Sequence, residues 1–335
     1  MFKIKKFILS FLIFSLVSIN QLLAKENTAA IFVYHRFGET NYPSTNIKIN
    51  QFKKHIEELK KNNYNVLPVN EIVNAIINKK DLPEKTVGLT IDDAFLSIYK
   101  KAWPILKKNN LPFTIFVSTS PIKAESKNYM DWDKIRELVN SGVTIGHHTK
   151  NHLHLVNSSE KEVVNEIEDA SKDFLQNLGY VPEIFAYPYG EYSYEIKQIT
   201  KRYFKAAFGQ QSGNLYNDID IFEMPRFSLN EKYGDLKRFK FAANSYGLQI
   251  KNILPIDRTI KDINPPLLGF TLLNNIDSLI QCYPSHNIKA NLIKLGNKRI
   301  EIRFDKEFPK GRTRINCTTN DNGKWRWSGF QFINP

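Results

Sequence analysis

The chain has few residues that could anchor it covalently or carry it across a membrane. Its only cysteines are Cys282 and Cys317, so no cysteine near the start can carry a lipid anchor. The apolar run at 7–19, broken only by serines, is shorter than the roughly 20 residues of a membrane-spanning helix. Three lysines precede this run and Ala24 follows it, which predicts a signal peptide over residues 1–24 and a periplasmic or secreted protein. The alternative is an uncleaved N-terminal anchor. After cleavage no stable membrane span is expected.

The chain also lacks a long basic block and any nucleic-acid-binding motif. Its formal net charge is +13, and removal of the three signal-peptide lysines lowers this to +10. The remaining lysines are scattered, which favours weak attraction to an acidic polymer or membrane surface. Nucleic acid is therefore not an expected partner.

Length and composition indicate a globular protein with two unequal domains. Hydrophobic residues make up 42% of the chain, and 311 residues remain after Ala24. That length suits one large and one small domain, which we place at 25–263 and 264–335. In an exported protein the two cysteines can form a disulfide, and we favour this over two buried free thiols.

Strand-like and helix-like segments alternate between about residues 28 and 247. Short apolar runs predict strands at 29–35, 86–91, 113–118, 143–145 and 184–187. Helical spacing or capping residues predict helices at 49–63, 97–110 (kinked by Pro104), 131–142 and 158–179. This alternation predicts an α/β fold with a parallel sheet or barrel.

In such folds functional residues gather where strands end, and several of these predicted ends carry polar side chains. The run Leu89–Phe95 reads LTIDDAF and places Asp92 and Asp93 directly after a buried strand. Adjacent carboxylates repel each other, so their pairing calls for a reason. The alternative is a plain turn, because aspartate is common in turns and at helix N-termini.

A cluster of histidines follows the strand predicted at 143–145. His147, His148, His152 and His154 lie within eight residues. His148 and His152 are four apart, so one helical turn would place them on the same side. Imidazoles near a carboxylate suit zinc or a similar divalent ion. The alternative is a polar surface loop with accidental histidines.

Two further strand ends carry weaker signals. Pro188 and Gly190 predict a tight turn flanked by Tyr187 and Tyr189, which could point a backbone N–H into a pocket. His35 follows the first predicted strand. Taken alone, the turn could be an ordinary aromatic turn, and a lone histidine is more often structural than catalytic.

Together these motifs resemble the polysaccharide deacetylases, also called the NodB-homology or carbohydrate esterase family 4 enzymes. The resemblance covers Ala29 to Phe227 and rests on Asp92-Asp93, on the pattern His-Thr-x-x-His at 148–152, and on Pro188-Tyr189. The Tyr-His pair at 34–35 is similar to that of the exported poly-N-acetylglucosamine deacetylases. The resemblance implies a distorted (β/α) barrel of the NodB type.

The resemblance also implies roles for these residues. Asp93, His148 and His152 would hold a divalent metal ion, with zinc favoured over nickel, cobalt or iron. Asp92 would be the general base. The implied reaction removes N-acetyl groups from the hexosamine units of an N-acetylated polysaccharide. The backbone N–H of Tyr189 would stabilise the oxyanion, and substrate contacts are expected from Tyr187, Pro188 and Trp132.

The sequence departs from the common family pattern at three points. No histidine lies between His154 and His286, so the usual late histidine acid is missing and His35 is expected to replace it. The arginine expected about four residues before the Pro-Tyr motif is absent, with Ile184 near its place, and Arg226 is expected to orient Asp92 instead. Ala94 stands where a glycine often follows the acid pair.

The tail beyond about residue 265 predicts a small all-β domain, with Ile300, Ile302 and Phe304 on one face of a strand. Trp325 and Trp327 share a face and could stack on sugars, or could belong to a core. The function alternatives are a deacetylase, a catalytically impaired glycan-binding protein on the same fold, and a metal hydrolase acting on another amide or ester.

Overall fold

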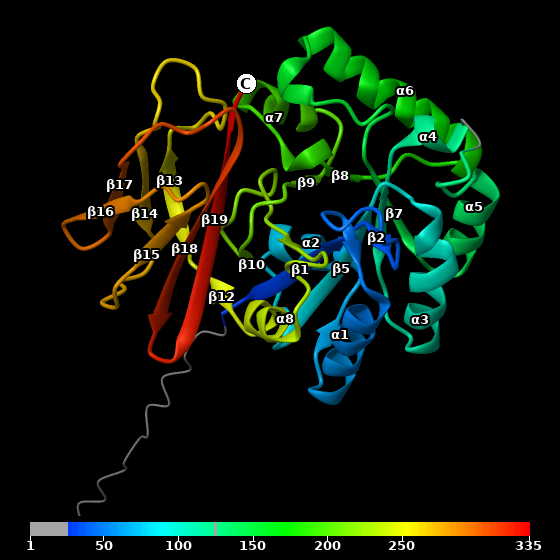
Figure 1. The fold of residues 1–335 in the computed structure, drawn as a ribbon, viewed down its shortest axis with the longest axis horizontal. Coiled ribbons are helices and arrows are strands. Elements are labelled where there is room, and N and C mark those ends of the chain that lie inside the picture. Colours follow the sequence, from blue (N-terminus) through cyan, green and yellow to red (C-terminus); the bar gives the residue numbers. More distant parts are fainter. Residues whose placement is uncertain (1–25, 124–125) are drawn as a thin grey trace, which may run out of the picture.

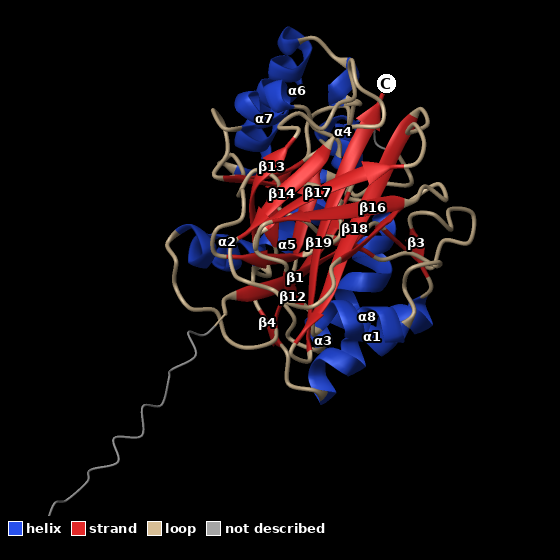
Figure 2. Ribbon diagram, turned by 90° about the vertical axis from the view of Figure 1, so that its left-hand side faces the viewer, coloured by secondary structure: helices blue, strands red, loops and turns tan. Residues whose placement is uncertain are grey.

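The structure, a computed structural model, describes residues 26–123 and 126–335, so the expected signal peptide lies outside the described residues. A curved, mainly parallel sheet wrapped by helices forms the larger part, and two smaller sheets lie beside it (Figure 1). Figure 2 faces the smaller sheets and shows them in front of the helical part. Within the described ranges, none of the helices combines the length and apolar character that a bilayer span requires.

The large sheet has nine strands, and its central path runs β10-β1-β5-β6-β7-β8-β9. All neighbours along this path from β1 to β9 are parallel, as the alternation of strands and helices predicts. The strands are β1 (Thr28–Tyr34), β4 (Asn65–Val66), β5 (Thr86–Asp92), β6 (Thr114–Val117), β7 (Thr144–His147), β8 (Ile184–Ala186), β9 (Ala206–Phe208), β10 (Asn214–Tyr216) and β11 (Phe227–Ser228). Every residue of β5 is buried, because helices cover the outer face of the sheet and side chains fill its concave face.

One short segment, Met224 to Ser228, joins the two ends of this curved sheet. Met224 bridges to Phe208 at the end of β9, and β11 pairs in parallel with β1. The segment therefore closes the sheet into a distorted barrel. Arg226 lies in the middle of the closing segment, between the two bridges.

Helices cover the outside of the barrel. They are α1 (Ile49–Lys61), α2 (Val69–Ile77), α3 (Trp103–Lys108), α4 (Thr119–Lys123), α5 (Trp132–Asn140), α6 (Glu160–Leu178), α7 (Tyr194–Thr200) and α8 (Leu236–Ala243). In α1 the buried face carries Phe52, Ile56 and Leu59, as its spacing predicts. The long α6 is capped at its start by Ser159, whose hydroxyl accepts from the Glu162 N–H, and at its end by Gly179 with φ of 79°.

The helix predicted at 97–110 differs from a simple kinked helix. A π-helical turn over Ile98–Ala102 leads into α3, and Pro104 is the second residue of α3. Proline has no N–H to donate to the preceding turn, so the backbone there adopts wider i→i+5 bonding.

The C-terminal region is a pair of four-stranded sheets, ordered β12-β19-β18-β15 and β13-β14-β17-β16. The strands are β12 (Tyr246–Gly247), β13 (Ile250–Leu254), β14 (Leu268–Leu272), β15 (Gln281–Pro284), β16 (Ala290–Leu295), β17 (Arg299–Phe304), β18 (Gly311–Asp321) and β19 (Lys324–Asn334). Its core includes Phe270, Ile302 and Phe330. The expected boundary between the two domains lies at residue 264. Because β12 and β13 precede that residue, the β region includes strands from both sides of the expected boundary.

The two cysteines lie opposite each other on β15 and β18 and form a disulfide. The expected bridge between Cys282 and Cys317 is therefore present.

Trp327 packs against Phe227 and Phe241, between the β region and the barrel. Trp325 is 42% exposed and contacts Phe241 edge-on.

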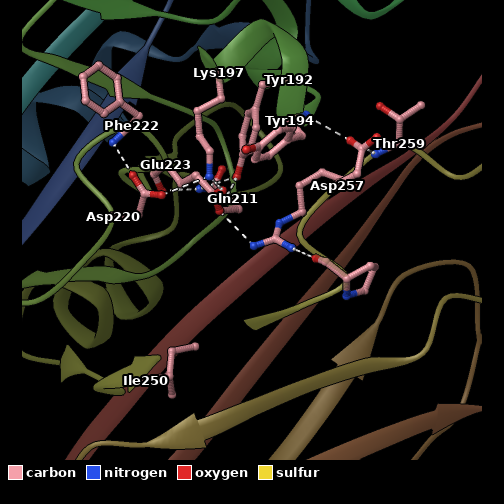
Figure 3. Close-up of polar contacts among 12 residues, drawn as sticks. Tyr192, Tyr194, Lys197, Gln211, Asp220, Phe222, Glu223, Ile250, Asp257 and Thr259 are labelled. Atoms are coloured by element: carbon pink, nitrogen blue, oxygen red, sulfur yellow. Dashed lines mark hydrogen bonds and ion pairs between the residues drawn. The ribbon is translucent and has the colours of Figure 1, made fainter. Parts of the chain in front are cut away.

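An ionic network, buried except at Asp220, connects the start of the closing segment to the β region (Figure 3). Glu223 accepts from Arg258 at 2.9 Å and also from Lys197, which binds Asp220 at 3.0 Å. Burial would lower the pKa of Lys197, but the carboxylates of Glu223 and Asp220 raise it above its ordinary value. Two cations thus balance two carboxylates immediately before the closing segment, which fixes the start of that segment.

Candidate active site

The polar residues that the motifs single out meet at one end of the barrel. Asp92 is the last residue of β5 and Asp93 follows it, His148 follows β7, and His35 follows β1. These are carboxyl ends of parallel strands, where loops can present side chains without disturbing the sheet. One cleft of about 810 Å³ is lined by His35, Asp93, His152 and Tyr189, among other residues.

Three side chains converge with the geometry of a metal site. The Asp93 Oδ1 lies 3.5 Å from the His148 Nε2 and 3.4 Å from the His152 Nε2. These three ligand atoms all lie within 4.8 Å of one another. Two imidazoles and one carboxylate suit a divalent transition metal and leave coordination positions open.

The surroundings of His148 also fit a bound cation. Its Nδ1 lies 2.6 Å from the Ala186 carbonyl oxygen, so the N–H is on Nδ1 and the Nε2 lone pair is free. The His148 Nε2 is buried without a hydrogen-bond partner among the described residues. A buried polar nitrogen without a partner is costly, and a metal ion would satisfy it. The residues present therefore fit a divalent metal.

The backbone around these ligands adopts left-handed conformations. Asp93, Ala94, Thr149 and His152 have φ of 75°, 58°, 66° and 56°. Such conformations are unfavourable for non-glycine residues and persist where the surrounding structure enforces them, often at functional sites. The predicted helical turn between His148 and His152 is absent. Instead, left-handed Thr149 and His152 bend a loop and bring the two rings to 4.7 Å between centroids.

The segment between the two histidines is held from behind. The Asn151 N–H and side-chain amide both donate to the Glu166 carboxylate of α6, the N–H at 2.8 Å. The Thr149 hydroxyl accepts from the His152 N–H at 3.2 Å. These bonds stabilise the strained loop, because they replace the hydrogen bonds that a helical turn would make.

Asp92 is fully buried and forms a two-point ion pair with Arg226. The Arg226 Nη1 and Nη2 lie 2.7 and 2.9 Å from the two carboxylate oxygens. Arg226 also donates to the Gly209 carbonyl at 2.9 Å and to the Thr90 hydroxyl at 3.2 Å. Burial would raise the pKa of Asp92, but the charge and hydrogen bonds of Arg226, together with the nearby His148 and His35, lower it. Asp92 is thus held ionised in a fixed orientation.

The pKa values of the three converging residues, Asp93, His148 and His152, also depend on burial and on their charged neighbours. Burial would raise the pKa of Asp93, but the His148 imidazole, 3.5 Å away, and the nearby His35 and His152 hold it well below its usual range. Burial would lower the pKa of His148, but Asp93 and Asp92 raise it. Burial, and next the neighbouring His148, lower the pKa of His152 to about 4. A deprotonated carboxylate and a neutral His152 are the forms that bind metal.

His35 lies on the rim of the cleft beside Asp92. Its Nε2 is 3.9 Å from the Asp92 Oδ2, and its side chain is 15% exposed. Sequence reasoning could not name the carboxylate that faces His35, and the structure identifies it as Asp92. His35 is therefore in reach of both the cleft and the buried carboxylate.

The turn at Pro188–Gly190 is unusual in its backbone. Tyr189 and Gly190 have φ of 58° and 68°, and a Cβ on Gly190 would lie 2.5 Å from the backbone nitrogen of Gln210. The His154 ring stacks on the Tyr189 ring at 3.7 Å and hydrogen-bonds Glu191 at 2.7 Å. His154 is thus a supporting neighbour of the turn, and it is absent from the converging trio.

The three expected substrate-contact residues do not line this cleft. Tyr187 is fully buried and donates to the Phe222 carbonyl at 3.1 Å, and Pro188 is buried. Trp132 begins α5 and packs edge-on against Phe174.

Sequence reasoning missed several residues that do line the cleft, namely Gln210, Glu231, Tyr233, Arg312 and Arg314. The alternation of charged and apolar residues along β18 could have shown that its arginines lie on one face. It could not have shown that this face meets the barrel.

Comparison with known proteins shows which proteins this chain is similar to. Residues 79–205 match the polysaccharide deacetylase family. The putative polysaccharide deacetylase YxkH of Bacillus subtilis is 27% identical over 197 residues, covering 58% of this chain and 69% of that protein. The poly-beta-1,6-N-acetyl-D-glucosamine N-deacetylase of Staphylococcus aureus (strain MRSA252) is 24% identical over 238 residues, covering 63% of this chain and 82% of that protein.

Solved structures show the same fold. The Streptococcus pyogenes deacetylase PplD, in complex with acetate, superposes with a TM-score of 0.61 at 22% identity, covering 65% of this chain and 99% of that one. IcaB from Ammonifex degensii gives a TM-score of 0.56 at 22% identity, covering 65% of this chain and 97% of that one. Residues 79–205 therefore match a polysaccharide deacetylase domain, the barrel has the NodB-type fold of these structures, and a further β region follows it.

Proposed function

We propose that this protein is a metal-dependent hydrolase that removes N-acetyl groups from N-acetylhexosamine units of an extracellular or cell-wall polysaccharide. The observation that carries the proposal is the convergence of Asp93, His148 and His152 beside the buried Asp92–Arg226 pair, at the edge of an open cleft. The relatives named as polysaccharide deacetylases support it.

Asp93, His148 and His152 would hold the divalent ion, which we take to be zinc, with nickel, cobalt and iron as alternatives. When bound, such an ion polarises a carbonyl oxygen and lowers the pKa of water. The chain's own residues supply the other functions. Asp92 accepts the proton of the attacking water, and Arg226 keeps that carboxylate ionised and oriented.

Two further groups complete the reaction. The backbone N–H of Tyr189 donates to the oxygen of the acetyl group as negative charge develops there. His35 donates a proton to the leaving amine, because an amine expelled without a proton is a very poor leaving group. The products are acetate and a free amino sugar, so atoms and charge balance with one water consumed.

The test is an acetate-release assay on purified protein. The protein is stripped of metal and then reloaded with zinc, nickel, cobalt or iron, and each form is given N-acetylglucosamine oligomers or peptidoglycan. We expect acetate only from metal-loaded protein. Binding of oligomers without acetate release from any of these substrates would instead support the impaired, glycan-binding alternative.

A further inference from the structure

The β12-β19-β18-β15 sheet of the β region brings charged residues to the catalytic cleft. Along β18, Thr313, Ile315 and Cys317 are buried in the β-region core, while Arg312 and Arg314 lie on the opposite face. Both arginines line the same cleft as His35, Asp93 and His152. The cleft is thus built partly from a region outside the match to the deacetylase family.

This face is docked closely against the barrel, so the two arginines are held in place. A Cβ on Gly329 of β19 would lie 2.1 Å from the Ser212 carbonyl oxygen. Gln331, which is fully buried and pairs with Arg314 across the strands, donates to the Gly190 carbonyl at 2.8 Å. Its side-chain oxygen accepts from the Arg314 Nε at 3.0 Å.

Arg312 is attached to the turn beside the proposed metal site. Its Nη1 donates to the Tyr189 carbonyl at 3.0 Å. Its Nε lies 3.5 Å from the Glu191 carboxylate, whose other oxygen binds His154 at 2.7 Å. Glu191 is therefore shared between two partners and only partly neutralises Arg312.

Arg314 has no such partner. Within the described part of the chain its side chain forms no ion pair, and its only side-chain hydrogen bond is the one from Nε to Gln331. Burial, and then the positive charge of Arg312, lower the pKa of the Arg314 guanidinium. The lining carboxylate Glu231 already accepts from Asn46 at 2.7 Å and lies 3.5 Å from the Lys48 ammonium.

Two guanidinium groups therefore share one side of the cleft without matching negative charge. A partly buried cation without a counter-ion is unfavourable, and a planar guanidinium fits a carboxylate or phosphate through two parallel hydrogen bonds. A ligand that supplies such a group would remove this cost. A ligand with free amino groups would instead be repelled.

We propose that Arg314, together with Arg312, forms an anion-binding subsite of the cleft, and that the polysaccharide therefore carries carboxylate or phosphate groups near the N-acetylated unit. This inference rests on the proposed function for its link to catalysis. It assigns the substrate to acidic glycans, in contrast to neutral polymers of N-acetylglucosamine alone.

The test separates binding from turnover. Calorimetry would measure the affinity of metal-loaded protein for three probes, namely an oligogalacturonate, a phosphorylated oligosaccharide and a neutral chito-oligosaccharide. Each is measured with the parent, with Arg314→Gln and with Arg314→Lys. The control is Arg303→Gln, which removes the same charge from β17, where the side chain is 41% exposed and pairs with Glu301.

We expect the parent to bind at least one acidic probe more tightly than the neutral one. Arg314→Gln should lower that affinity by roughly ten- to a hundredfold, the usual worth of hydrogen bonds to a charged group. Arg314→Lys keeps the charge but loses the two parallel hydrogen bonds of the guanidinium, so its affinity for the acidic probe should lie between those of the parent and Arg314→Gln. Arg303→Gln should bind like the parent. The acidic probe that binds more tightly identifies carboxylate or phosphate as the source.

Equal binding of acidic and neutral probes would overturn the subsite, as would equal losses in Arg314→Gln and Arg303→Gln. Acetate release from acidic and neutral N-acetylated oligomers is measured in parallel. Charge-selective binding without acetate release would leave the subsite standing and remove the proposed function. Acetate release without charge-selective binding would remove the subsite and leave the proposed function standing.

Discussion

Replacing Arg226 by methionine tests the buried ion pair behind the proposed base. The two side chains are similar in length, but the change leaves the Asp92 carboxylate without its cation in a fully buried position. Two hydrogen bonds to Asp92 and one each to Gly209 and Thr90 are lost together. Because an uncompensated buried charge remains, we expect Arg226→Met to lower the free energy of unfolding by about 3–5 kcal/mol.

Urea unfolding of metal-free protein at pH 7 measures this change. The control is Arg303→Met, since Arg303 is 41% exposed and pairs only with Glu301 at 3.1 Å, so its loss should cost at most about 1 kcal/mol. The double variant Arg226→Met with Asp92→Asn removes the uncompensated charge. It should be more stable than Arg226→Met alone by about 2 kcal/mol or more.

Two results would refute this reasoning. One is a cost for Arg226→Met no greater than that of Arg303→Met, which would mean that Asp92 is solvated or compensated by another group. The other is a double variant whose cost equals the sum of the two single costs, which would mean that the pair is not coupled.

Four further predictions concern other parts of the molecule. His152→Ala should lower metal content, measured by atomic emission, and abolish acetate release; normal values of both would contradict the proposed ligand set. His35→Ala should keep the fold and bound metal but lower kcat by at least about a hundredfold, and a kcat within a fewfold of the parent would exclude it as the acid. The disulfide joins residues 35 apart, so changing Cys282 and Cys317 to serine should cost about 3–4 kcal/mol in urea unfolding, and no loss would argue against the bridge. Burial lowers the pKa of His55 from 6.5 to about 4. The unfolded chain therefore binds a proton that the native state does not, and stability should fall by up to about 3 kcal/mol as pH drops from 6.5 to 4; His55→Gln should flatten this loss.

Local sequence determined the alternation of strands and helices and the placement of polar residues at strand ends. Asp93, His148 and His152 could be singled out because they lie in short motifs after apolar strands, and the resemblance that these motifs carry implied their role as ligands. The starts of two helices could be predicted for the same reason, since the capping side chains of Asp131 and Ser159 bind backbone N–H groups only three residues away. Such features depend on contacts within one turn or one strand, which neighbouring residues specify.

Local reasoning failed where the backbone itself is unusual. The spacing of His148 and His152 predicted a helical turn, but Thr149 and His152 are left-handed and the segment is a loop. Hydrogen bonds from Asn151 to Glu166, on a helix further along the chain, enforce that shape. Spacing alone cannot distinguish the two conformations, because both bring residues four apart together.

Only the tertiary structure decided which distant residues complete the site. Arg226 and Asp92 are 134 residues apart in sequence and meet because Met224 to Ser228 closes the barrel between β9 and β1. Arg312 reaches Tyr189 across 123 residues because the β12-β19-β18-β15 sheet packs on the barrel. The sequence named the expected metal ligands through the resemblance that its short motifs carry. Closure of the barrel and docking of the sheet determined the partners of Asp92 and the charge of the cleft, since these depend on packing between distant segments.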